Sequence, residues 1–268
     1  MDGICLLCME HRELRDSHLI PKAAYRLVRD KPELGGGSPV LFLPGEKSAA
    51  QTDKQIKNHM LCSECESKLS SQGETWMGRL WANWNDFPLL DQLTATGPIA
   101  SGEAMDIYKC ESISKETLAA LRYFAISVFW RASVWDWGRQ KNSYRNALGA
   151  KYEEQFRLFL LGSQSELNAL TIVSVNKNPK MNGTIMFPYI QRGEGIWVHC
   201  FEILGIRFHT FVGQTPPDGI KAPFQAMGSD LVLITVDFVK QPEFFNMVRW
   251  AKESVPRGKF ANYLKGER

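Results

Sequence analysis

The spacing of hydrophobic residues along the chain changes after residue 162, from a helical period to strand-like runs. Between residues 114 and 137, apolar side chains recur at steps of three and four, which predicts a helix covered on several sides. We expect Ser114 to cap this helix and Gly138 to end it. A second helix is predicted for residues 144–161, with Gly162 as its stop.

After these helices, short runs rich in β-branched and aromatic residues predict strands. They cover residues 170–175, 184–187, 195–201, 206–212 and 231–236. A hairpin is expected around residues 202–205, a last helix over 244–252, and a frayed tail from Arg257 onward. The pattern indicates an α+β fold whose larger, C-terminal domain combines helices with a mostly antiparallel sheet.

The N-terminal part alternates short elements with polar loops. Pro21 suits the first position of a helix over residues 22–29, and residues 40–43 read as a short strand. A further helix is predicted after Cys65, followed by Trp76, Leu80, Trp81 and Trp84 at helical spacing, which indicates core packing. Pro88 and residues 94–98 mark a boundary or linker. The predicted organisation is a module over 1–75, a connecting region over 76–113 and a domain over 114–268.

Composition is that of an ordinary globular protein: 268 residues, of which 44% are hydrophobic and 23% charged. The net charge of +3 is compatible with a nucleic-acid partner without requiring one. The most apolar stretch, residues 118–137, carries Arg122, Arg131 and Asp136, so it predicts a buried helix and no membrane partner. Arg131 should be paired with a buried carboxylate. No secretory signal begins the sequence, and we expect a cytoplasmic protein with reduced cysteines.

Two C-x-x-C pairs provide the strongest chemical signal. Cys5, Cys8, Cys62 and Cys65 have the spacing of a four-thiolate zinc site, which joins distant segments of the chain. Because four thiolates leave no open coordination position, such a zinc is structural and not catalytic. The remaining cysteines, Cys110 and Cys200, are expected to be small buried residues.

Between the two pairs lies the segment Asp16-Ser17-His18-Leu19-Ile20-Pro21. Pro21 disfavours helical geometry at Ile20, so His18 should lie on extended backbone just before a helix. An imidazole in that position is suited to proton transfer near neutral pH. The simpler alternative is that His18 hydrogen-bonds the zinc thiolates or a buried carbonyl group.

Cys5/Cys8, His18-Leu19-Ile20-Pro21 and Leu61-Cys62-Ser63-Glu64-Cys65 together resemble the zinc-bearing HNH endonucleases over residues 1–75. The resemblance implies a ββα-type module in which His18 is the general base that activates water against a phosphodiester of DNA or RNA. It also implies a catalytic Mg²⁺ or Mn²⁺, for which Glu66, directly after the last cysteine, is the expected ligand, alone or with Asp16. Modules of this kind often serve as effectors in bacterial defence against phage.

The chain departs from the family at the residue before the base. Ser17 stands where an Asp or His usually binds the metal, and Glu66 stands where His or Asn is common. The chain is also similar to uncharacterised bacterial HNH-like proteins that share the segment Phe129-Trp130-Arg131-Ala132-Ser133. That resemblance extends over most of the chain and implies no particular activity.

Two hypotheses therefore follow from the sequence. The first is a metal-dependent nuclease with His18 and Glu66 as its catalytic residues. The alternative, favoured by Ser17, is a zinc-stabilised scaffold that binds nucleic acid or protein, with a protein partner for the C-terminal domain, and catalyses nothing. Residues 115–160 and the segment from Lys240 onward each carry an excess of four positive charges, which fits either a phosphate-binding surface or solvated helix faces.

Overall fold

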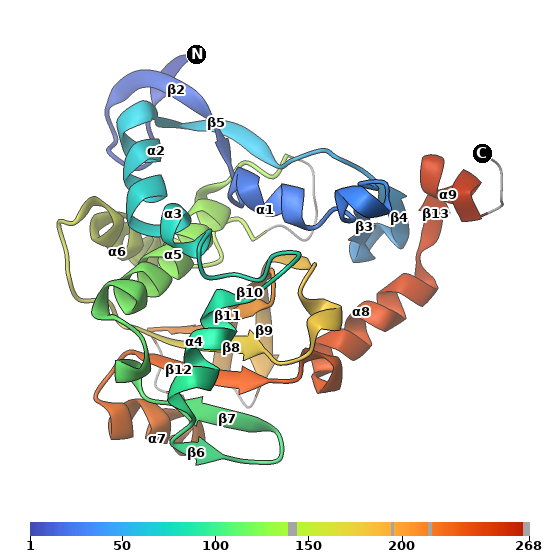
Figure 1. Cartoon of the computed structure of the whole chain (residues 1–268). Coiled ribbons are helices and arrows are strands. Elements are labelled where there is room, and N and C mark those ends of the chain that lie inside the picture. The colour runs from blue at the N-terminus through green and yellow to red at the C-terminus, as the bar shows by residue number, and fades with distance from the viewer. Residues whose placement is uncertain (139–143, 194–195, 214–215, 265–268) are drawn as a thin grey trace.

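Figure 1 shows the computed structural model of the chain, which describes residues 1–138, 144–193, 196–213 and 216–264. Helices and strands are mixed, which confirms the α+β prediction. Within the described residues, no helix is both long enough and apolar enough to cross a membrane.

The N-terminal part contains two small sheets and several short helices. Its elements are β1 (Asp2–Ile4), β2 (His11–His18), α1 (Lys22–Leu27), β3 (Val40–Leu43), β4 (Ser48–Gln51), β5 (Lys57–Cys62), α2 (Ser63–Leu69), the π-helical turn η3 (Ser70–Glu74) and α3 (Thr75–Met77). β2 lies between β1 and β5 and pairs with both in antiparallel register. Helix α2 follows β5 without a loop, so two antiparallel strands and a helix form one unit.

The rest of the chain supplies the longer helices and the large sheet. Its elements are α4 (Pro88–Thr96), β6 (Ala100–Ser101), β7 (Met105–Tyr108), α5 (Lys115–Val134), α6 (Gly149–Leu161), β8 (Ala169–Asn176), β9 (Ile185–Gly193), β10 (Ile196–Ile203), β11 (Ile206–Val212), α7 (Asp218–Met227), β12 (Leu231–Val236), α8 (Pro242–Glu253), β13 (Val255–Arg257) and α9 (Lys259–Leu264). Single 3₁₀ turns lie at Pro32–Leu34, Pro44–Glu46, Cys110–Ser112, Pro179–Met181 and Phe238–Lys240.

Helix α5 begins as predicted and ends earlier. The Ser114 hydroxyl accepts a hydrogen bond from the Thr117 amide at 3.1 Å, which confirms the cap. The helix stops at Val134 and not at Gly138, because Trp135 adopts extended backbone geometry. The indole of Trp137 then donates to the Ala132 carbonyl at 2.8 Å and satisfies one of the free carbonyls at the helix end.

Other predicted boundaries were wrong for local reasons. Helix α6 begins at Gly149 and not at Tyr144, since Asn146 and Gly149 have left-handed backbone angles (φ 58° and 71°) that interrupt a helix. The predicted linker at residues 94–98 is largely helical: α4 starts at Pro88 and ends at Gly97, whose φ is 73°. Strand β9 runs past Pro188, which an edge strand tolerates.

Part of the tail that was predicted to fray has secondary structure: Arg257 ends β13, and Lys259–Leu264 form α9, while residues 265–268 lie outside the described residues. Strand β13 pairs in parallel with β4, placing Val255 opposite Ser48, and the Val255 amide donates to the Lys47 carbonyl at 2.8 Å. With β3 on the other side of β4, these strands form a second three-stranded sheet. Figure 1 shows α8 reaching across from the large sheet to this small one.

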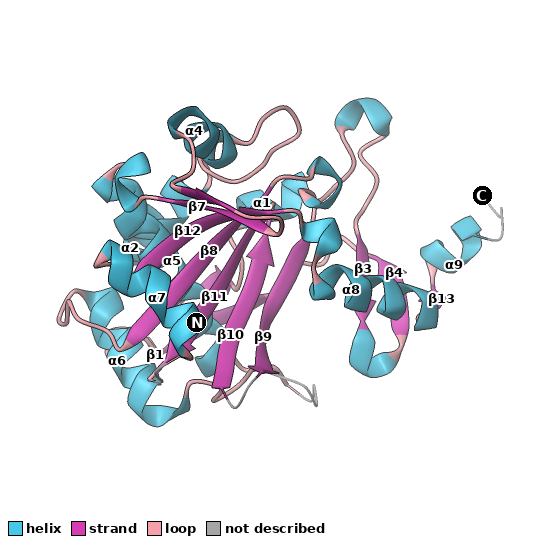
Figure 2. Ribbon diagram, turned by 90° about the horizontal axis from the view of Figure 1, so that it is seen from below, coloured by secondary structure: helices cyan, strands magenta, loops and turns pink. Residues whose placement is uncertain are grey.

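The large sheet has the strand order β6-β7-β12-β8-β11-β10-β9 and is antiparallel except for the pair β12 and β8. Strand β12 is buried on both faces: Leu231 and Leu233 belong to the main core, and the alternate residues Val232, Ile234 and Val236 belong to a second cluster under α7 and α8. Figure 2 shows the twisted sheet with helices around it.

Helix α5 lies between the N-terminal unit and the large sheet (Figure 1). On the sheet side, Phe129 packs edge-on to Phe201 with ring centroids 5.0 Å apart, and Phe124 contacts Phe201 and Phe208. One cluster of buried side chains runs through both parts, from Cys5 to Leu233. The N-terminal unit therefore shares its core with the rest of the chain.

Candidate metal centre and histidine site

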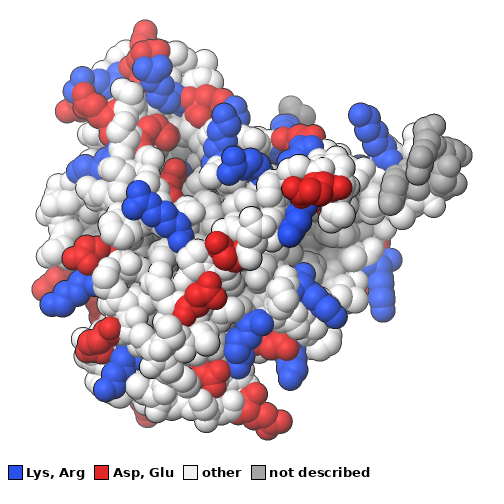
Figure 3. Space-filling model, viewed as in Figure 1, with Lys and Arg blue, Asp and Glu red and all other residues white. Residues whose placement is uncertain are grey.

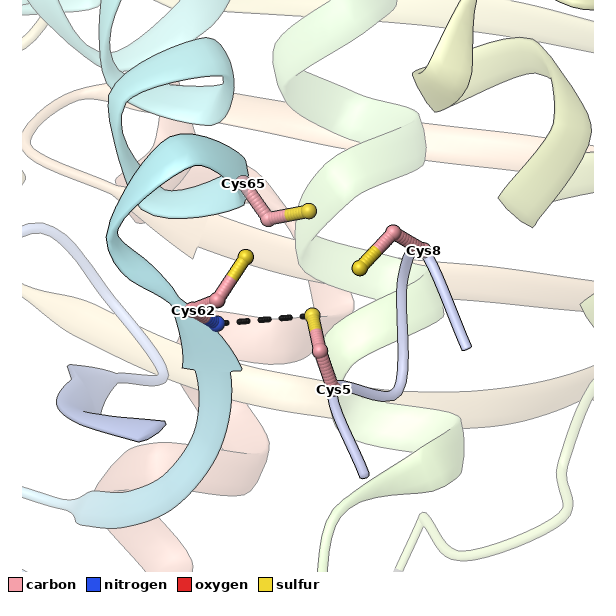
Figure 4. Close-up of side chains that lie close together, drawn as sticks. All are labelled: Cys5, Cys8, Cys62 and Cys65. Atoms are coloured by element: carbon pink, nitrogen blue, oxygen red, sulfur yellow. Dashed lines mark hydrogen bonds between the residues drawn. The ribbon is translucent and has the colours of Figure 1, made fainter. Parts of the chain in front are cut away.

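Four cysteines meet at the junction of β5 and α2. The sulfur atoms of Cys5, Cys8, Cys62 and Cys65 all lie within 4.8 Å of one another, and Figure 4 shows them pointing toward a common centre. This confirms the predicted grouping: the four residues are positioned to bind a metal. Among the residues that the structure describes, no other group of three or more His, Cys, Asp or Glu side chains is so placed.

The loop from Cys5 to Cys8 is held in a tight turn by its backbone. The Leu6 amide donates to the Met60 carbonyl at 2.9 Å, and the Met9 amide donates to the Cys5 carbonyl at 2.8 Å. Met9 closes the turn with a φ of 63°, a left-handed geometry unusual for a residue with a side chain. The Cys62 amide donates to the Cys5 sulfur at 3.4 Å, as drawn in Figure 4.

The sulfur atoms compete for protons because they are so close together. Hydrogen bonding from Cys65 lowers the pKa of the Cys5 thiol to about 4, and the same contact raises the pKa of Cys65. Burial raises the pKa of Cys8. A divalent metal would replace these protons and stabilise all four thiolates at once, so the donor set fits a tetrahedral soft-ligand ion.

His18 is the last residue of β2, and its ring is oriented by a residue that sequence reasoning missed. The His18 Nε2 atom lies 2.7 Å from the amide oxygen of Gln55. With this amide oxygen as the acceptor, Nε2 is the donor, and the Nδ1 atom of a neutral ring would be the acceptor. The Tyr25 ring from α1 lies 6.3 Å away, centroid to centroid.

Ser17 and Glu66 meet on the other side of the strand. Ser17 is 1% exposed, and its hydroxyl donates to the Arg15 carbonyl at 3.4 Å; it lies near enough to Glu66 to lower the pKa of that carboxylate. Burial is the larger influence and raises the pKa of Glu66. The Oε1 atom of Glu66 is buried and has no hydrogen-bond partner among the described residues. Ser17, directly before the histidine, thus faces the residue directly after the last cysteine.

Arg131 and Glu74 complete the surroundings of His18. Arg131 on α5 is 1% exposed; its Nη1 atom donates to the His18 carbonyl at 2.8 Å and lies 2.7 Å from Glu74 Oε1. This confirms that Arg131 pairs with a carboxylate. No motif identified the partner, because Glu74 belongs to a π-helical turn that hydrophobic spacing does not reveal.

Asp16 does not join this group. Its carboxylate is exposed and pairs with Lys57 Nζ at 2.8 Å, across the antiparallel ladder of β2 and β5. That lysine lowers the pKa of Asp16. In the structure Glu66, and not Asp16, is therefore the carboxylate beside Ser17.

Surface charge is mixed on the face that Figure 3 displays, where Lys and Arg alternate with Asp and Glu. Much of the positive charge in residues 115–160 is engaged in contacts: Arg122 pairs with Asp230, and Arg157 pairs with Glu154 and donates to the Leu7 carbonyl. These contacts favour the structural interpretation of that basic stretch. A cavity of about 410 Å³ lies beside α1, and Arg26, Arg29 and Trp84 are among its lining residues.

Comparison of the chain with protein-family models, with curated proteins and with solved structures finds no match. The geometry of the four cysteines and of the His18 surroundings is therefore what supports a function.

Proposed function

We propose that the chain is a metal-dependent endonuclease of HNH type, with a structural zinc on the four cysteines and His18 as general base. The observation that carries the proposal is the contact between β2 and α2, which brings Ser17 near enough to Glu66 to influence its carboxylate. Support for a ββα-type module comes from the antiparallel pairing of β2 with β5 and from α2, which follows β5 directly, although α1, β3 and β4 lie between the two strands in the chain. His18 is the next residue of β2 after Ser17, and the Glu66 carboxylate has an oxygen without a hydrogen-bond partner among the described residues.

A hard divalent cation fits the Glu66 carboxylate. Buried polar atoms usually have a partner, so the lone Oε1 atom of Glu66 is a suitable ligand for Mg²⁺ or Mn²⁺. Mg²⁺ often binds through one or two carboxylates and takes its other ligands from water and substrate phosphate. When bound, the cation would neutralise charge on the phosphate and its leaving oxygen.

The protein residues then have defined tasks. Gln55 holds the Nε2 proton of His18, so Nδ1 is the atom that accepts a proton from the attacking water. Ser17 orients the Glu66 carboxylate from the neighbouring strand. The cavity beside α1 has Arg26 for a phosphate and the Trp84 indole for a base, while Arg29 is paired with Asp53 and Asp30 adds a negative charge to the lining.

The test is cleavage of supercoiled plasmid DNA and of a folded RNA by the purified protein with Mg²⁺ or Mn²⁺. We expect His18→Ala to reduce the rate by about 100-fold or more, the usual contribution of a positioned general base. His11→Ala is the matched control, because His11 begins the same strand and is exposed. Cleavage by the His18→Ala protein at the wild-type rate would refute the mechanism.

A second function is favoured by one observation. Ser17 is a poor metal ligand, and the only cluster with three or more potential metal ligands in the described part of the chain is the cysteine group. The alternative is a zinc-stabilised scaffold that binds nucleic acid or protein. Three results together would favour the scaffold over the nuclease. The protein would cleave nothing with either cation, would contain one zinc ion per chain, and would show no binding of Mn²⁺ by calorimetry.

A further inference from the structure

Arg131 occupies a position where a charge is costly. It lies in the middle of the shared core, on a helix whose other buried residues are mostly apolar. A buried guanidinium loses its hydration, and an apolar side chain of similar size often gives equal or greater stability. Stability alone therefore does not explain an arginine at this position, where leucine or methionine would fit.

The guanidinium joins two segments that are far apart in the sequence. Nη1 donates to the His18 carbonyl at 2.8 Å and lies 2.7 Å from Glu74 Oε1, an ion pair without hydrogen-bond geometry. Nε lies 3.4 Å from the Ser127 carbonyl of the same helix. The Nη2 atom is buried and has no hydrogen-bond partner among the described residues. Arg131 thus binds the backbone of His18, whereas Gln55 binds its ring.

The π-helical turn brings Glu74 within reach of Arg131. A Cβ atom on Gly73 would lie 3.3 Å from the Phe124 Cα atom and 3.2 Å from the Tyr123 ring, so only glycine lets this turn lie against α5 without displacement. π-Helical turns within helices occur frequently at functional sites. The turn and the helix together fix the place of the guanidinium.

We propose that Arg131 is a positioning residue for His18, so that α5 belongs to the site although it lies outside the zinc module. This inference rests on the proposed function. Arg131 fixes the backbone at His18, Gln55 fixes the ring, and the imidazole is held at both ends. Misplacement of a reacting group by about 1 Å can reduce a rate 100-fold, so this restraint has a catalytic consequence.

The experiment compares Arg131→Lys with Arg157→Lys in the full-length protein. Arg157 is the matched control, since its Nη1 donates to another backbone carbonyl of the N-terminal unit, that of Leu7, at 2.7 Å, and its ion-pair partner is Glu154. We expect Arg131→Lys to lower kcat for plasmid nicking by about 10- to 100-fold with KM within about threefold, because the loss is one of orientation. Arg157→Lys should leave both constants unchanged.

A second readout does not need activity. The chain has five histidines, so the ring signals of ¹³C-labelled protein can be assigned by single substitutions. Arg131→Lys should shift the ring signals of His18, and Arg157→Lys should not. If the wild-type protein cleaves nothing, the proposed function fails, and these signals still decide whether Arg131 orients His18.

Wild-type kcat together with unshifted His18 signals in a folded Arg131→Lys protein would overturn the inference. If Arg131→Lys does not fold, Glu74→Gln takes its place, because it keeps the arginine and weakens only one of its contacts. A smaller loss of kcat and a smaller shift of the His18 signals are then expected, and the absence of both would contradict the proposal.

Discussion

The Nη1 atom of Arg131 lies 2.8 Å from the carbonyl oxygen of His18, although 113 residues separate them in the sequence. The contact connects the central helix α5 with the last residue of β2. It extends the candidate site beyond the cysteine-bearing module, and the surroundings of His18 come from at least three separate parts of the chain.

Loss of the metal centre should destabilise the whole chain, since the cysteines belong to the shared core. For Cys65→Ser we expect zinc content to fall from one ion per chain toward zero, and the melting temperature to fall by about 10 °C or more. Elemental analysis and circular dichroism provide the measurements. Cys110→Ser is the control, because Cys110 lies outside the cluster; an equal loss in both variants would contradict a metal-specific effect.

Ser17→Asp should create a stronger cation site beside Glu66. Two adjacent carboxylates repel each other when no cation is bound, so we expect a lower melting temperature in the presence of a chelator. Because both carboxylates can bind Mn²⁺, we expect its affinity to be about tenfold higher by calorimetry. Ser67→Asp, on the exposed side of α2, serves as the control. Unchanged Mn²⁺ affinity in Ser17→Asp would count against a cation at this position.

His199 should make stability depend on pH. Its ring is hydrogen-bonded to the Tyr144 hydroxyl, and burial lowers its pKa to about 4, below the unfolded value of about 6.5. Between pH 4 and pH 6.5 the unfolded state therefore binds more protons than the folded state. This group contributes about 3 kcal/mol to the free energy of unfolding above pH 6.5, and that contribution is lost as the pH falls toward 4. Urea unfolding of His199→Gln should show less acid destabilisation than the wild type or His59→Gln. If the stability of His199→Gln and that of the wild type changed with pH in the same way, the prediction would be contradicted.

Arg207 forms a buried network whose members depend on one another. Its guanidinium is 2.7 Å from Glu202 Oε2 and 2.9 Å from Glu243 Oε2, and it lies over the Phe238 ring at 4.1 Å. Arg207→Met leaves two buried carboxylates unpaired and should cost about 3–5 kcal/mol in the free energy of unfolding. The double variant Arg207→Met/Glu202→Gln should lose less than the sum of the single losses, measured by urea unfolding. Strict additivity would show that the contact contributes nothing.

Local patterns in the sequence predicted the two long helices α5 and α6 and five strands of the large sheet, β8 to β12. They missed α4, α7 and the strands β6 and β7. The Ser114 cap, the Gly162 stop, strand β12 over residues 231–236 and the four-cysteine group all depend on residues near one another in sequence or on ligand chemistry. Strand β5 was missed, because its first residues are polar and its partner β2 is remote. Strand β13 was missed for the same reason, since it pairs with a strand about 200 residues earlier.

The sequence by itself determined the chemical identities at the site: four thiolates, the histidine before a helix, and the carboxylate after the last cysteine. Only the tertiary structure decided which groups surround the histidine. Gln55, Glu74 and Arg131 approach it from a loop, a π-helical turn and the buried helix α5. Their meeting depends on how the shared core packs, and packing joins residues without regard to their order in the chain.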